Sequence, residues 1–242
     1  MKFIRIVRKQ GLSAPVFALA LASAILIALI AFRVIAGAQI RHAYLVWNLF
    51  LAWLPLVFAV FAAERFAVMN DPRDRKFLAL GLAWLLFFPN APYLFTDFVH
   101  VLVAWRPSFW TELTLILMCA MTGFLAGFLS LQVMHALATR LWGRVKGWLF
   151  VAAVSGLAGF GVYLGRFERL NSWDVLTNPL RLLDGARLGL WNLATQWHHT
   201  KFLILFSLFL LLAYVMLFAL TQRSLVGDDM RSLTLKNELG KS

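Results

Sequence analysis

The sequence is poor in charged residues. Asp, Glu, Lys and Arg make up 14% of it, whereas a soluble domain carries about 25%. Hydrophobic residues reach 62%, against about 45–50% in soluble domains. A soluble protein of 242 residues has no interior large enough for this much apolar surface. The composition therefore excludes an ordinary soluble domain and indicates lipid as the solvent.

Cysteine is nearly absent too. A single residue, Cys119, excludes an intramolecular disulfide and a cysteine metal cluster. Because it lies within an apolar run, we expect it to be a small, buried packing residue. The glycine patterns of nucleotide-binding loops, the HExxH zinc motif and a nucleophile motif are also missing. The sequence indicates no particular cofactor, and its identity stays open.

Basic residues are the exception to this low charge. The net charge is +12, but no basic–aromatic nucleic-acid motif accompanies it. In membrane proteins Lys and Arg accumulate in cytoplasmic loops, which explains the excess without nucleic acid. Membrane lipids are the expected partners, and the sequence identifies no protein partner.

Uncharged stretches long enough to span a bilayer are plentiful. Each holds about 20 residues, enough for a helix to cross roughly 30 Å of hydrocarbon. They are continuous and not alternating, so we expect an all-α, polytopic transmembrane bundle of about six helices. The six stretches are Gly11–Phe32, Ala43–Ala63, Phe77–Thr96, Leu113–Met134, Gly147–Gly165 and Phe202–Gln222.

The first stretch allows a second interpretation. Basic residues precede it, and Ala36-Gly37-Ala38 resembles a signal-peptidase site. The apolar run is longer than the usual 7–15 residues of a signal peptide. We favour an uncleaved first helix, and N-terminal sequencing of the mature protein would separate six helices from five.

The distribution of Lys and Arg predicts the orientation. With the N-terminus inside, 15 of the 23 basic residues fall on the cytoplasmic side. This imbalance favours cytoplasmic N- and C-tails. We therefore expect one integral membrane domain, residues 1–242, with a long outer loop at 166–201.

The third stretch is interrupted by Pro89 and Pro92. Proline removes a backbone donor and clashes with the preceding turn. The 12 residues of Phe77–Phe88 make a helix of only about 18 Å, so the break falls within the membrane. Backbone broken at that depth must be buried in protein or face water. A functional break and a simple proline kink are the two interpretations.

Small residues and a capping motif predict packing elsewhere. Gly123 with Gly127, and Gly161 with Gly165, form GxxxG pairs, which let helices approach closely. Asn178-Pro179 predicts a helix start in the long outer loop. Its apolar stripe fits either an interfacial helix on the membrane or packing under a neighbouring loop. The stripe comprises Leu183, Ala186, Leu190, Leu193 and Trp197.

Two polar strings at the predicted outer side carry a family resemblance. They are Trp84-Leu-Leu-Phe-Phe-Pro-Asn-Ala-Pro-Tyr93 with Thr96-Asp97 and His100, and Tyr163-Leu-Gly-Arg-Phe-Glu-Arg-Leu-Asn-Ser-Trp-Asp174. The chain is similar, from about Asn48 to about Leu220, to the bacterial membrane family called domain of unknown function 1361. That family has a Trp-x-Asp element where this chain has Trp110-Thr111-Glu112, an acid on a longer arm. The resemblance implies a multi-pass protein of the bacterial plasma (inner) membrane, and it brings no activity.

Asp97 and His100 stand three residues apart, so they share one face if that stretch is helical. With Glu112 or Asp174 they would offer nitrogen and oxygen ligands suited to zinc or another divalent metal. No second histidine stands at helical spacing, and the adjacent pair His198-His199 would point apart on a helix. An Asp–His hydrogen bond that orders a helix end is the preferred interpretation, and no metal is predicted.

Arg166 and Arg169 allow two further interpretations. An arginine fork suits phosphate or carboxylate, so they could clamp an anionic lipid headgroup between Trp110 and Trp173. Alternatively, they pair with Asp97, Glu112 or Asp174 in a structural network.

Together these residues predict an outer polar vestibule that binds a small molecule or lipid headgroup. The alternatives are an enzyme acting on a lipid or lipid-linked substrate at the outer leaflet and an assembly or scaffold protein. In the enzyme, Asp97 or Glu112 would be the general base and His100 a proton shuttle. The candidate ligand-binding residues are Asn90, Tyr93, Asp97, His100, Trp110, Arg166, Arg169, Asn171, Trp173 and Asp174.

Overall fold

Helices account for all the regular structure of the described chain. The computed structural model describes residues 2–35, 43–98 and 109–239, and no strand occurs among them. Six helical segments within these residues are long and apolar enough to cross a membrane. They confirm the predicted all-α, multi-pass fold. The segments are α2 (Ser13–Ile35), α3 (Ala43–Met69), α4 (Arg75–Phe87) with its continuation to Phe98, α7 (Phe109–Trp142), α8 (Arg144–Phe167) and the first part of α11 (Trp197–Leu239).

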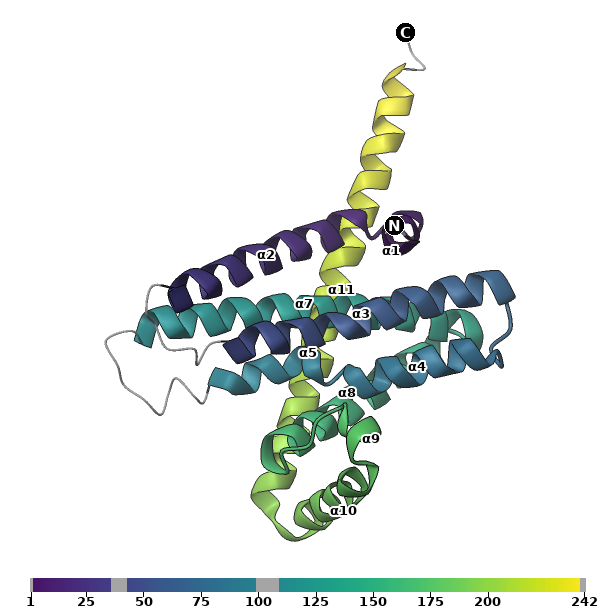
Figure 1. Ribbon diagram of the computed structural model, residues 1–242. Coiled ribbons are helices and arrows are strands. Elements are labelled where there is room, and N and C mark those ends of the chain that lie inside the picture. Colours follow the sequence, from purple (N-terminus) through teal and green to yellow (C-terminus); the bar gives the residue numbers. More distant parts are fainter. Residues whose placement is uncertain (1, 36–42, 99–108, 240–242) are drawn as a thin grey trace.

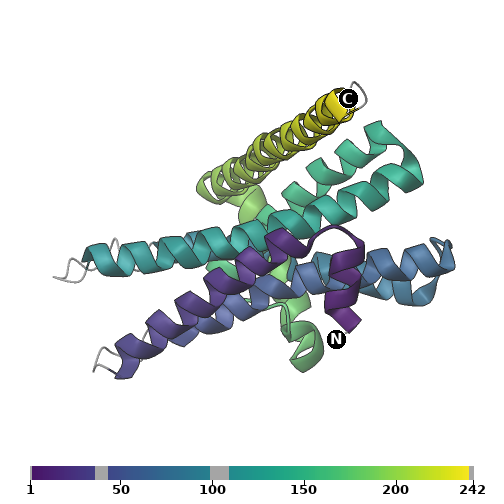
Figure 2. The ribbon, with the colours of Figure 1, turned by 90° about the horizontal axis from the view of Figure 1, so that it is seen from above.

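Figure 1 shows α2, α3, α4 and α7 running roughly along one another, whereas α11 crosses them steeply. A short amphipathic helix, α1 (Lys2–Lys9), lies across α3 in the view of Figure 2. The turn between α3 and α4 contains Asp74, and we call this end of the bundle the Asp74 end. The segment Ala36–Ala38, which resembles a cleavage site, lies outside the described residues.

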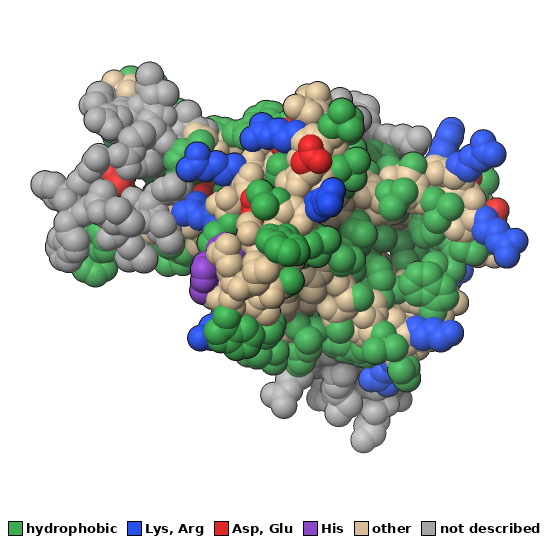
Figure 3. Space-filling view, turned by 90° about the horizontal axis from the view of Figure 1, so that it is seen from below, with side chains coloured by type: hydrophobic (Ala, Val, Ile, Leu, Met, Phe, Trp, Pro, Cys, Tyr) green, Lys and Arg blue, Asp and Glu red, His purple; other side chains and the backbone are tan. Residues whose placement is uncertain are grey.

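Burial separates the inner helices from the peripheral ones. Of the most apolar part of α7, 61% is buried, against 22% for α2 and 11% for α11. The exposed side chains between the two ends are largely hydrophobic, among them Leu82, Leu149 and Leu205. Figure 3 shows such side chains spread over the face that carries α9 and α10, with basic groups around its margin. Lipid contact explains an apolar surface of this kind, because hydrocarbon does not penalise it.

The third span is broken where the prolines predict it. Helix α4 ends at Phe87, and it is followed by the short α5 (Asn90–Tyr93) and the 3-10 turn η2 (Leu94–Phe98). This broken stretch is buried in protein, since Ala91, Pro92 and Leu94 are inaccessible to solvent. Burial among other helices satisfies the requirement for irregular backbone at membrane depth.

The two GxxxG pairs pack against the broken stretch, one from α7 and one from α8. A Cβ added at Gly127 on α7 would lie 2.6 Å from the Ala91 Cβ. A Cβ added at Gly161 on α8 would lie 2.5 Å from the Pro89 Cγ. Both distances are far below van der Waals contact, so only glycine permits this approach. The predicted close packing is thus confirmed, and its partner is the broken third span.

An ion pair between Arg65 and Asp74 connects α3 to the start of α4 at the Asp74 end. Asp74 caps α4 by accepting the Phe77 N–H at 2.9 Å, and Arg65 donates two 2.8 Å hydrogen bonds to its carboxylate. These bonds, that from Arg65 first, hold the pKa of Asp74 well below its usual range.

The long loop contains α9 (Asp174–Thr177) and α10 (Pro179–Thr195). Asn178 accepts the Arg181 N–H at 3.2 Å, which confirms the predicted cap. The face of α10 that packs on the protein is made by Gly185 and Gly189, which approach Leu170 and Leu164. Leu183 and Leu190 of the predicted apolar stripe are mostly exposed.

Candidate functional site

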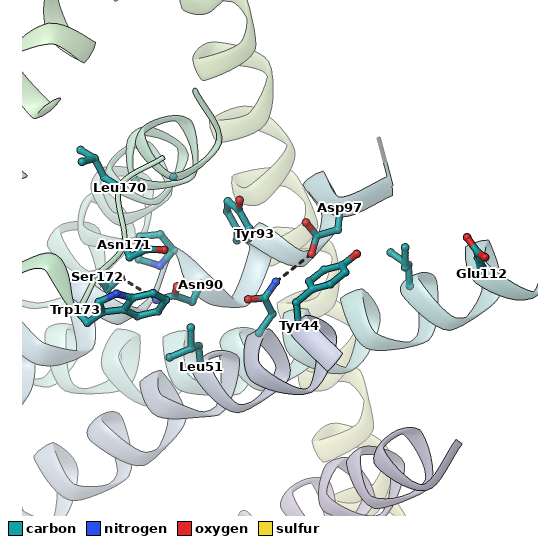
Figure 4. A pocket seen from close by; sticks show the side chains of 15 residues that line it. Tyr44, Leu51, Asn90, Tyr93, Asp97, Glu112, Leu170, Asn171, Ser172 and Trp173 are labelled. Atoms are coloured by element: carbon teal, nitrogen blue, oxygen red, sulfur yellow. Dashed lines mark hydrogen bonds between the residues drawn. The ribbon is translucent and has the colours of Figure 1, made fainter. Parts of the chain in front are cut away.

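A cavity of about 470 Å³ opens at the end of the bundle opposite Asp74. We call this the cavity end. Its walls come from the start of α3, the broken third span, the start of α7, the end of α8 and the loop before α9 (Figure 4). The lining residues are Tyr44, Asn48, Leu51, Pro89, Asn90, Tyr93, Asp97, Glu112, Ile116, Gly161, Gly165, Leu170, Asn171, Ser172 and Trp173.

Helix α3 presents Tyr44, Asn48 and Leu51 to the cavity. These positions follow one another at helical spacing, so their side chains project from one face. The Asn48 Nδ2 donates to the Asp97 Oδ2 at 3.2 Å. Figure 4 shows this bond, with the Tyr44 ring lying beside Asp97. An amide within the uncharged first part of α3 thus has a specific partner across the cavity.

Asp97 is the buried charge of the site. It lies on η2 with 2% of its surface exposed. The Arg166 Nη1 on α8 lies 4.0 Å from its Oδ1. A carboxylate removed from water is tolerated when donors and a cation compensate it, and Asn48 and Arg166 fulfil those roles. The pairing of Arg166 with Asp97 is one of the two predicted interpretations of the arginines.

Asn90 joins the break to the loop before α9. Its Nδ2 donates to the Phe87 carbonyl and to the Ser172 Oγ, both at 2.9 Å. Ser172 in turn donates to the Leu86 carbonyl at 2.9 Å. These bonds satisfy the carbonyls of Leu86 and Phe87, the last two residues of α4, which lack a partner within the helix because the helix ends there. Asn90, which lies between the two prolines, therefore holds the loop before α9 against the broken third span.

The structure brings together many of the predicted site residues, but not all. Trp110 is 72% exposed and Arg169 is also exposed, and neither lines the cavity. Asp174 is buried and accepts the Asn171 N–H at 2.7 Å, which orders the turn into α9. His100 lies outside the described residues. Lining the cavity are Asn90, Tyr93, Asp97, Glu112, Asn171 and Trp173, with Arg166 behind Asp97.

His199 takes part in a hydrogen-bond network outside the cavity. The His199 Nδ1 is 3.2 Å from the Tyr163 hydroxyl, which lies 3.4 Å from the Glu168 carboxylate. Asn192 on α10 donates to the same carboxylate at 2.9 Å. This network joins α8, α10 and α11. Among residues 2–35, 43–98 and 109–239, no group of three or more His, Cys, Asp and Glu side chains is placed to hold a metal.

Sequence reasoning missed Tyr44, Asn48 and Leu170 as lining residues. A signal was present for two of them, because Tyr44 and Asn48 are four residues apart and polar within an apolar run. Leu170 had no such signal. It reaches the cavity because the chain turns after Arg169, whose backbone φ is +54°.

The lining has a definite chemical character. It combines two carboxylates, three amides, hydroxyls from Ser172 and two tyrosines, and the ring of Trp173. Trp173 packs edge-on against Trp47 at 5.9 Å, which fixes its position. None of the described lining residues is Lys or Arg. Such a surface offers many acceptors and some donors, and it suits a neutral, hydroxyl-rich ligand better than a phosphate.

A family model described as "Protein of unknown function (DUF1361)" matches residues 47–216. The match covers both polar strings and every cavity-lining residue except Tyr44. No curated protein and no solved structure matches the chain.

Proposed function

The chain belongs to the DUF1361 family, whose description gives no activity, and we propose that this multi-pass membrane protein binds a small polar molecule or lipid headgroup in the cavity at its cavity end. One observation carries the proposal: a buried aspartate, Asp97, opens onto a cavity of about 470 Å³. A charge retained in a membrane span indicates function more often than packing.

The charge of the lining selects among ligands. Asp97 and Glu112 contribute carboxylates, and Arg166, which does not line the cavity, is paired with Asp97. A phosphate entering the cavity would meet like charge, whereas a sugar-like headgroup would find acceptors, amides and an aromatic ring. We therefore propose a neutral, hydroxyl-rich ligand in preference to the anionic headgroup that the arginines suggest in the sequence.

Orientation and location belong to the same proposal. The excess of basic residues in the segments predicted to be cytoplasmic supports cytoplasmic N- and C-tails in a bacterial inner membrane. The cavity would then open toward the outer leaflet. A reporter that works only in the cytoplasm should be active when it is fused to the C-terminus. Activity of a reporter that works only in the periplasm would show the opposite orientation, and the cavity would then open toward the inner leaflet.

Native mass spectrometry of the gently extracted full chain tests ligand binding. Asn171 lies on an exposed part of the cavity wall, so Asn171→Trp should fill the space without disturbing the Asp97 contacts. Asp184→Trp adds the same side chain on the exposed surface of α10 and serves as the matched control. We expect a copurifying or added monoglucosyl diacylglycerol to remain on the control and to be lost from Asn171→Trp.

Equal retention of this glycolipid by both variants would overturn the proposal. Release of a chemically altered glycolipid by the unmodified protein, abolished in Asp97→Asn, would instead identify the enzyme alternative. Copurification of the same protein partner with both variants, without any ligand in the cavity, would favour a scaffold.

A further inference from the structure

A second concave site lies at the Asp74 end, remote in sequence from the cavity residues. It is a groove of about 530 Å³ between the start of the chain, the end of α3 and the end of α7. Its lining residues are Lys9, Gln10, Leu12, Ala63, Glu64, Phe66, Ala67, Gln132, Val133, Ala136, Leu137 and Arg140. We propose that this groove binds one anionic phospholipid of the adjacent leaflet, independently of the function proposed for the cavity.

The first argument is the order of side chains along α7. Gln132, Val133, Ala136 and Leu137 line the groove before Arg140, which lies nearest the end of the helix. The α7 wall of the groove thus has the Gln132 amide at its inner end, is apolar from Val133 to Leu137, and is basic at its rim. A phospholipid has the same order, with acyl chains below a charged headgroup.

The second argument is the rigid placement of its basic rim. Helix α1 buries Ile6 and Val7 against the bundle and leaves Arg5, Arg8 and Lys9 exposed. The Gln10 Nε2 donates to the Val60 carbonyl at 3.3 Å, which fixes the end of α1 to α3. Arg140 stacks over the Phe66 ring at 5.4 Å. Amphipathic helices with basic polar faces lie at the surface of anionic membranes, and α1 brings such a face beside the groove.

Two further groups favour a lipid over a bare ion. The Gln10 Oε1 is buried with no hydrogen-bond partner among the described residues, and Gln10 lines the groove, so a headgroup hydroxyl that displaces its cover would give this oxygen a donor. Glu64 lies within the groove and pairs with Lys9 at 3.6 Å, which reduces the attraction for a small anion. Apolar contact along Leu12, Ala63 and Val133 must then supply part of the affinity, and only an acyl chain provides it.

The test is the thermal unfolding midpoint of the purified full chain with added phosphatidylglycerol, phosphatidylcholine or inorganic phosphate. A ligand that binds only the folded state raises this midpoint. We expect phosphatidylglycerol alone to raise it. Lys9→Gln with Arg140→Gln should weaken the effect about 30-fold in lipid concentration, the contribution of two basic side chains near a membrane surface. Glu64→Gln should strengthen it.

Two matched variants keep the outcome decisive. Ala136→Trp fills the groove from its exposed wall and keeps every charge, so it should abolish the phosphatidylglycerol effect. Arg73→Gln with Arg75→Gln removes two exposed basic residues of the same end that do not line the groove, and it should change little. Equal stabilisation by phosphatidylcholine, full stabilisation by inorganic phosphate, or equal losses in both double variants would each overturn the proposal. A change of oligomeric state in Ala136→Trp would do so too, since it would identify a second copy as the occupant.

Discussion

At the cavity end, three helical segments bring Asp97, Arg166 and Asn48 together, whereas at the Asp74 end Arg65 and Asp74 form a partly buried ion pair across the turn between α3 and α4. The first arrangement needs close helix packing, because its members come from α3, η2 and α8. The second joins residues only nine positions apart. The pairing of charged side chains therefore depends on tertiary packing at the cavity end, and mainly on a local turn at the Asp74 end.

The sharpest way to break this contrast is to disrupt the packing beneath the cavity. Gly127→Leu would force a side chain against Ala91 and should lower the free energy of unfolding by about 3 kcal/mol, the upper range for overpacking. Gly156→Leu is the matched control, since a Cβ there meets nothing within 4 Å. Thermal unfolding of both variants in detergent measures the difference. Equal stability of the two variants would contradict the close packing of Gly127 against Ala91.

Removing Arg166 should have the next largest effect. Arg166→Met leaves the buried Asp97 carboxylate without its cationic partner and should cost about 2 kcal/mol of stability. Adding Asp97→Asn to it should recover part of this loss, because the orphaned charge is gone. A double-mutant cycle from thermal unfolding tests the coupling. Strictly additive losses would show that the two side chains do not interact.

Asn48 offers a milder test of the same end. Asn48→Leu keeps the apolar character of α3 and removes one hydrogen bond to Asp97, so it should cost about 1 kcal/mol. It should also weaken retention of a cavity ligand in native mass spectrometry. Leu51→Asn moves an amide to a neighbouring lining position, and it should not restore retention when combined with Asn48→Leu. Restoration would mean that Asn48 serves the cavity only as a generic polar group.

The smallest effect is expected at the Asp74 end, where water can replace lost partners. Asp74→Asn keeps the oxygen that caps Phe77 and removes the ion pair, so it should destabilise less than Asp74→Ala. The folded protein lowers the pKa of Asp74, so the stability from its charge is present above the ordinary carboxyl pKa of about 4 and is lost as the pH falls below it. The stability difference between the wild-type protein and Asp74→Asn should therefore shrink on acidification. A difference that grows at low pH would contradict this sign.

Much of the site is made by contacts between residues far apart in the sequence, and the sequence could not predict those contacts. Pro89 and Pro92 predicted the break, and Asn178-Pro179 predicted the start of α10, because both act on their own backbone. The glycine pairs predicted close approach, but not that both would face the broken third span. Ser172 showed no functional signal in the sequence, and only folding brings it to Asn90 across 82 positions.

Apolar run length and proline chemistry are local properties, so the sequence predicted lipid as the solvent, about six spans and the place of the break. Tertiary structure alone decided which polar residues meet. It placed Arg166 behind Asp97, left Arg169 and Trp110 outside the cavity, and brought Asn48 into it. Contacts between side chains on different helices depend on the rotation and crossing angle of those helices. Glycine pairs allow close helix packing, but they do not specify which helix packs against them.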